Sequence, residues 1–124
     1  MTAARRPDEF ELYDLALVVE RIEGQCTCDM RVGDRVEVRG GKLAIADARG
    51  FCLYALQAAL PLLPAKQRTS HPADWMETDT RVTCPDPACR LIMRIERTGR
   101  RLLRHEDVSA VPWEPPGADA PAGS

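Results

Sequence analysis

The feature that most constrains the fold of this chain is its longest apolar segment, at residues 50–64. Its leucines recur at helical spacing and predict a helix with one apolar face, formed by Leu53, Leu56, Leu60 and Leu63. Asp47 is expected to cap the start of this helix. Because Pro61 lacks an amide hydrogen and clashes with the preceding turn, we expect the regular helix to end near Leu60, and Pro64 to end the helical segment. Such a helix needs a sheet to cover its apolar face.

Other segments alternate apolar and polar side chains with a period of two, which is typical of half-buried strands. The first three predicted strands are residues 12–22, 35–39 and 42–46. A fourth begins at residues 81–84, is interrupted by Pro85-Asp86-Pro87 and continues at 91–97, and residues 100–104 predict a short partner strand or the start of a helix. Gly40-Gly41 predicts a hairpin, and Thr98-Gly99 predicts a turn. Trp75, in the irregular segment that precedes residues 81–84, is expected to fold over the core. The sequence therefore predicts an α+β fold, with a small curled, mostly antiparallel sheet of four to five strands and one packed helix.

Composition limits this fold to one small domain. Residues 1–10 and 112–124 are rich in Pro, Ala, Gly and charge and predict disordered ends, which leaves residues 11–111 as a single α+β domain. No apolar stretch is long enough to span a bilayer, and the first residues lack the apolar segment of a secretory signal. We therefore expect a cytoplasmic protein. The formal charge of -2 does not favour binding to bulk polyanions.

Five cysteines are many for a chain of 124 residues that is expected in a reducing compartment. Three stand at the boundaries of predicted elements: Cys26 after the first strand, Cys52 at the start of the helix and Cys84 at the break in the fourth strand. If the first and fourth strands are neighbours and the helix begins at their open ends, the three thiols converge. They would then form a site for Zn²⁺ or another soft metal, completed by Cys28, Cys89 or a solvent ligand.

Other roles for the cysteines remain open at this point. The spacings are Cys-x-Cys and Cys-x4-Cys, without the Cys-x2-Cys pairs of a zinc ribbon. Packed core cysteines and a redox pair are therefore alternatives, as is a nucleophilic Cys52 or Cys84 with Asp86 nearby. A nucleophile needs a base, and the two histidines, His71 and His105, stand in segments expected at the surface.

Several short segments resemble those of a family of small proteins of bacteria and archaea that are known only as conserved hypothetical proteins. The matching segments are Gly24-Gln25-Cys26, Val32-Gly33-Asp34-Arg35-Val36, Gly50-Phe51-Cys52, Cys84-Pro85-Asp86 and residues 91–97. The resemblance implies a compact α+β domain with Cys26, Cys52 and Cys84 at motif positions, and with Cys28 and Cys89 outside the motifs. It implies no activity.

Two further patterns bear on function. Six arginines between Arg90 and Arg104 could bind phosphate or nucleic acid, but they lack interleaved aromatic residues, and acidic neighbours favour a solvated surface instead. No Gly-rich phosphate loop is present, so no nucleotide cofactor is expected.

We therefore predict a small cytoplasmic accessory or binding protein whose cysteines hold a soft metal or a thiol-reactive ligand, beside a larger enzyme. The alternatives are a small enzyme or enzyme subunit that uses a cysteine and, with less support, nucleic-acid binding through the arginines.

Overall fold

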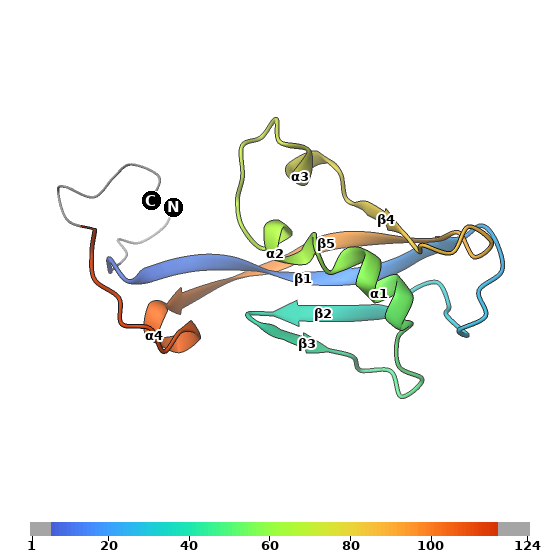
Figure 1. The fold of residues 1–124 in the computed structure, drawn as a ribbon, viewed down its shortest axis with the longest axis horizontal. Coiled ribbons are helices and arrows are strands. Elements are labelled where there is room, and N and C mark those ends of the chain that lie inside the picture. The colour runs from blue at the N-terminus through green and yellow to red at the C-terminus, as the bar shows by residue number, and fades with distance from the viewer. Residues whose placement is uncertain (1–5, 117–124) are drawn as a thin grey trace.

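The computed structural model describes residues 6–116 and is built on an open five-stranded sheet of order β3-β2-β1-β5-β4 (Figure 1). Two long strands, β1 (Glu9–Ile22) and β5 (Leu91–Arg104), form its centre. β2 (Arg35–Arg39) and β3 (Lys42–Ala44) extend it on one side, and β4 (Arg81–Thr83) on the other. All described pairings are antiparallel, which confirms the mostly antiparallel sheet of about five strands.

The part of the chain that the structure describes contains four short helices: α1 (Leu53–Ala59), α2 (Leu63–Lys66), α3 (Trp75–Thr78) and α4 (His105–Val108). α1 ends at Leu60, as Pro61 predicts. Its start at Cys52 is confirmed, since Cys52 is the N-cap. The cap expected at Asp47 is wrong, because the Asp47 carboxylate accepts a hydrogen bond from the Arg49 amide at 2.8 Å. Pro64 was also misinterpreted. It lies in the first turn of α2, where a missing amide hydrogen costs nothing.

β1 and β5 pair along their whole length, from Glu9 with Arg104 to Ile22 with Leu91. β1 thus begins two residues before the predicted domain boundary at residue 11. The turn predicted at Thr98-Gly99 is wrong, because β5 continues through these residues. The register passes from Gly99 opposite Asp14 to Arg97 opposite Leu15, so the extra residue is absorbed by a β-bulge.

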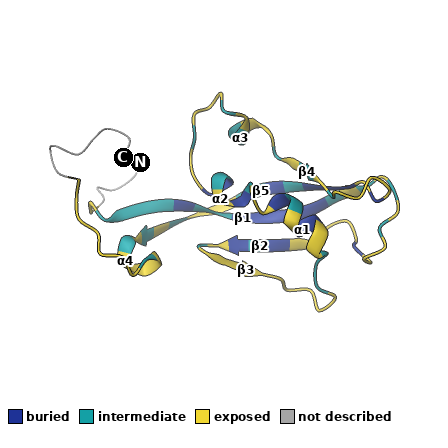
Figure 2. Ribbon diagram, viewed as in Figure 1, coloured by how far each residue is buried: buried dark blue, intermediate teal, exposed yellow. Residues whose placement is uncertain are grey.

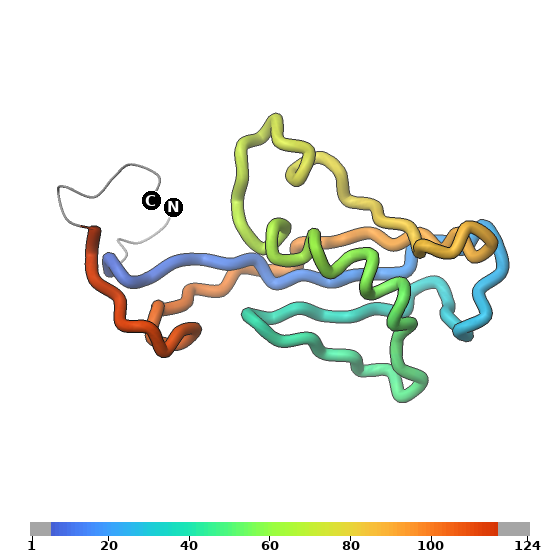
Figure 3. Tube along the Cα trace, viewed as in Figure 1, coloured from blue at the N-terminus to red at the C-terminus, as the bar shows by residue number. Residues whose placement is uncertain are grey.

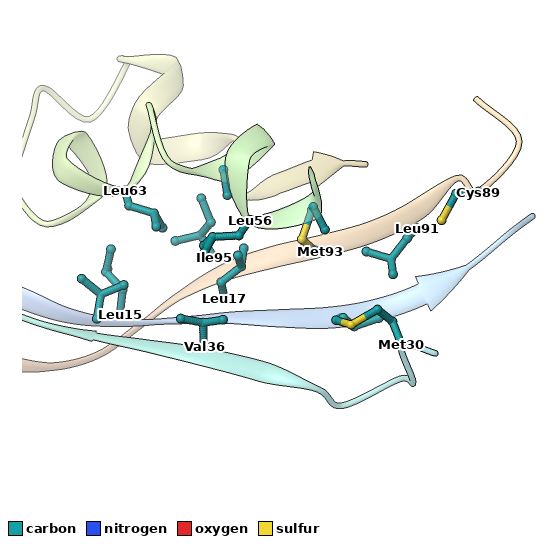
Figure 4. Close-up of a cluster of buried hydrophobic side chains, with 14 residues drawn as sticks. Leu15, Leu17, Met30, Val36, Leu56, Leu63, Cys89, Leu91, Met93 and Ile95 are labelled. Atoms are coloured by element: carbon teal, nitrogen blue, oxygen red, sulfur yellow. The ribbon is translucent and has the colours of Figure 1, made fainter. Parts of the chain in front are cut away.

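The core lies between the central strands and α1 (Figures 2 and 4). Leu17, Val36 and Met93 are fully buried on the sheet, and Ala55 and Ala59 are fully buried on α1. Each fully buried large apolar side chain contributes roughly 1.5–3 kcal/mol to stability. Trp75 does not cover this core as predicted. Its side chain stands at the start of α3 and is 65% exposed.

A polar network fastens α2 and α3 to β5, and we name it the Lys66–Arg97–Glu77 network. The Arg97 guanidinium donates to both carboxylate oxygens of Glu77, at 2.8 and 2.7 Å, and to the Lys66 carbonyl at 2.9 Å. The buried Lys66 ammonium donates to the carbonyls of Met76 and Asp79. Burial lowers the pKa of Lys66, and the hydrogen bonds from Arg97 lower that of Glu77 to about 2.

Residues 112–116 of the predicted tail form neither helix nor strand, while 1–5 and 117–124 lie outside the described residues. None of the helices found between residues 6 and 116 is long and apolar enough to cross a membrane.

Candidate thiol site

All five cysteines line one cavity of about 360 Å³, which we call the thiol cavity. Its lining residues belong to the segments after β1, at the start of α1 and before β5. Figure 3 shows that these parts of the chain come together at one end of the sheet. Three segments that are far apart in sequence supply the thiols: the loop after β1 with Cys26 and Cys28, the start of α1 with Cys52, and the β4–β5 connection with Cys84 and Cys89. The other lining residues are Thr27, Tyr54, Ala55, Pro85, Asp86 and Leu91.

The loop that carries Cys26 is held against the loop that carries Cys89 by backbone pairing. The Gly24 amide donates to the Cys89 carbonyl, and the Gln25 amide donates to the Ala88 carbonyl, both at 3.0 Å. A Cβ atom on Gly24 would lie 2.0 Å from the Ala88 carbonyl oxygen, so this close approach requires glycine. Gly24 therefore positions two of the five thiols.

Cys52 reaches the cavity through a turn and a contact with the neighbouring loop. Gly50 has a φ of 77°, a conformation that favours glycine, and it redirects the chain into α1. The Cys52 amide donates to the Met30 sulfur at 3.4 Å. The Cys52 segment thus lies beside the loop that contains Cys28.

A guanidinium ties these same two segments together. Arg49 donates to the Asp34 carboxylate at 2.7 Å, to the Asp47 carboxylate at 2.9 Å and to the Asp29 carbonyl at 2.6 Å. The second Asp34 oxygen accepts a hydrogen bond from the Arg31 amide at 2.9 Å. Arg49 therefore links the residue after Cys28 to the turn before Cys52.

Cys84 stands at the break in the predicted fourth strand. This strand is divided into β4 and β5, and its β5 part is the neighbour of β1, as the convergence of the thiols requires. Cys84 lies in the tight β4–β5 connection, where its amide donates to the Leu91 carbonyl at 2.9 Å. Asp86 shapes this connection because its carboxylate accepts a hydrogen bond from the Ala88 amide at 2.9 Å.

The thiols differ in their surroundings. Cys89 is 5% exposed and belongs to the core, and burial raises its pKa to about 11. Cys28 is exposed, and a hydrogen bond with the Cys52 thiol raises its pKa. Cys26, Cys52 and Cys84 are partly buried. All five cysteines are free, and no set of three or more His, Cys, Asp or Glu side chains within residues 6–116 is already arranged to hold a metal ion.

The histidines do not contribute to the cavity. His71 accepts a hydrogen bond from the Ala73 amide at 3.0 Å, and the His105 ring lies 2.6 Å from the Val111 carbonyl. Among the described residues that line the cavity, Asp86 is the one ionisable group besides the thiols and Tyr54. The geometry therefore offers sulfur ligands but no histidine base for a nucleophilic cysteine.

The predicted arginine patch is largely paired within the chain. Four of its guanidinium groups lie 2.6 to 3.6 Å from carboxylates: Arg94 from Glu96, Arg97 from Glu77, Arg101 from Asp14 and Arg104 from Glu106. Arg100 lies 3.5 Å from Glu11, and Arg90 donates to the Glu23 carbonyl at 3.1 Å. These pairs reduce the positive charge that a phosphate backbone would require.

No family model, curated protein or solved structure matches the chain. The resemblance to the family of small conserved proteins therefore stays a prediction. The function must be inferred from the thiol cavity itself.

Proposed function

We propose that this protein is a small cytoplasmic accessory protein that binds Zn²⁺ or another soft metal through its cysteines. The observation that carries the proposal is that three separate segments bring all five thiols to one cavity. Reduced thiols are the expected state in the cytosol, and clustered thiolates are the preferred ligands of soft metals. In this proposal α1 is the packed helix of the fold, and it presents Cys52.

The proposed ligands are Cys26, Cys52 and Cys84, with Cys28 and Cys89 available to complete the set. The first three are partly buried at the edge of the core, where the fold limits their movement. Cys28 is exposed on a loop and can swing toward a bound ion without disturbing the core. Binding requires that the thiols lose their protons, so we expect metal affinity to rise with pH.

An accessory role fits the surroundings of the cavity better than catalysis does. A catalytic cysteine would need a base, and the Asp86 carboxylate is already used in a backbone hydrogen bond. Tyr54 lines the cavity and is 62% exposed, and the neighbouring Leu53 is 67% exposed. Exposed apolar side chains beside a site favour contact with another protein, which supports action beside a larger enzyme.

Metal analysis of the full chain, purified without oxygen and with a reductant, tests this proposal. We expect the wild type to contain about one metal ion or more per chain. The triple variant Cys26→Ser, Cys52→Ser, Cys84→Ser should contain none. Thr27→Ala is the matched control, because Thr27 lines the same cavity without supplying a thiol. Metal-free wild-type protein with normal circular dichroism would contradict the proposal. If that metal-free protein binds a thiol-reactive organic compound, the cysteines hold a thiol-reactive ligand instead of a metal.

A further inference from the structure

We infer that the thiol cavity holds a cluster of two or more thiolate-bound metal ions and not a single ion. This inference rests on the proposed function and specifies its ligand. It concerns the number and grouping of the sulfur ligands.

The first argument is the number of ligands. A structural zinc ion takes four ligands in tetrahedral geometry. The cavity is lined by five thiols and also by the Asp86 carboxylate. One ion would leave at least one thiol unused on the cavity wall, whereas two ions that share a bridging thiolate can use all five.

The second argument is how the thiols are grouped. The segments that carry four of the thiols are joined in two pairs. Two ions about 3.5–4 Å apart that share a bridging thiolate can be served by both pairs together.

Hydrogen bonds between the segments define these two pairs. Cys26 and Cys89 are on the loops joined by the Gly24 and Gln25 amides. Cys28 and Cys52 are on the segments joined by the Met30 contact and by Arg49. Cys84 lines the same cavity and is the fifth ligand.

The third argument is the space between the pairs. The cavity volume of about 360 Å³ is far larger than the roughly 10–15 Å³ of the same measure that one water molecule needs. Ala55 and Leu91 supply apolar wall, so the space offers water few polar partners. A metal–thiolate cluster would fill it and satisfy the thiols together.

A titration of the metal-free full chain with Cd²⁺, without oxygen and followed by native mass spectrometry, tests the inference. We expect wild-type protein to saturate at two or more Cd²⁺ ions per chain, with sulfur-to-cadmium charge-transfer absorbance that rises until that ratio is reached. The double variant Cys28→Ser, Cys52→Ser should bind one ion fewer. Since both residues lie outside the buried core, this variant is expected to keep the wild-type circular dichroism.

The possible failures are distinguishable. Saturation of the wild type at one Cd²⁺ per chain would overturn the cluster and leave metal binding intact. The absence of any tightly bound Cd²⁺ would overturn both the cluster and the proposed function. Equal numbers of ions in the wild type and in the folded double variant would also overturn the assignment of Cys28 and Cys52 to the cluster.

Discussion

The Lys66–Arg97–Glu77 network and the thiol cavity both bring together side chains that form strong polar or metal-ligand interactions. In the network these side chains find their partners within the chain, and in the thiol cavity they face open space. Arg97 is matched by Glu77 and two carbonyls, and the buried Lys66 ammonium has two carbonyl partners. Throughout the described range, no buried side-chain nitrogen or oxygen lacks a hydrogen-bond partner. The five thiols, in contrast, face a cavity. Satisfied groups indicate a structural role, whereas gathered thiols around open space indicate a ligand.

The largest expected effect concerns the position where the two cysteine loops touch. Gly24→Ala should lower the free energy of unfolding by about 3 kcal/mol, because the new Cβ atom would overlap the Ala88 backbone and neither loop can yield freely. Urea denaturation of the metal-free chain measures this change. Gly41→Ala is the control, since a Cβ atom there meets nothing within 4 Å. Similar midpoints for the two variants would show that the loops are not tightly apposed.

A second prediction tests the structural role of the network through pH. The pKa of Glu77 falls from 4.5 to about 2 on folding, so its stabilising contribution is complete above pH 4.5 and is lost as the pH falls toward 2. Glu77→Gln should therefore be less stable than the wild type at neutral pH, and the difference should shrink below pH 4.5. Denaturation midpoints of the wild type and of Glu77→Gln, measured down to about pH 3, show whether this difference in stability shrinks.

Glu106→Gln is the control for this experiment. The Glu106 carboxylate is exposed and lies 3.6 Å from Arg104, so its removal should leave the midpoint almost unchanged. A Glu77→Gln variant as stable as the wild type at neutral pH would show that the network does not fasten α2 and α3. Metal content should be the same in both variants, because Glu77 is not among the residues that line the thiol cavity.

A smaller effect is expected at Arg49, which positions the thiol loops without lining the cavity. Arg49→Lys keeps the charge but cannot reach Asp34, Asp47 and the Asp29 carbonyl together. Metal affinity should fall about tenfold, as for other groups that orient metal ligands, while the number of bound ions stays the same. Competition with a chromophoric chelator measures this affinity.

Arg39→Lys is the matched control for Arg49→Lys. Arg39 pairs with Glu37 on the surface at 2.6 Å and does not contact the thiol loops. The metal affinity of the Arg39→Lys variant should equal that of the wild type. Equal affinity in the Arg49→Lys variant would refute a positioning role for Arg49.

The fold was predictable wherever a local pattern determined it. Period-two alternation gave the strands, and Pro61 gave the end of α1. Thr98-Gly99 was misleading because the same residues that favour a turn also suit a β-bulge, and only pairing with β1 distinguishes the two. The cap predicted at Asp47 was wrong because Asp47 closes its own turn with Arg49.

The cysteines that line the thiol cavity could be predicted from the sequence, but the contacts that hold their loops together could not. Element boundaries indicated that Cys26, Cys52 and Cys84 could meet, and they line the same cavity. The roles of Gly24 and Arg49 depend on contacts with residues 88–89 and 29–34, and no local pattern encodes such distant contacts. The Gly24-Gln25-Cys26 segment was the one available signal, because a glycine near a cysteine can indicate close backbone approach.

X-ray absorption spectroscopy at the edge of the bound metal tests the central claim most directly. Protein purified without oxygen, at the metal content it carries from the cell, should give a first shell dominated by sulfur at about 2.3 Å. A first shell of nitrogen and oxygen alone would contradict the assignment of the thiol cavity as a metal site.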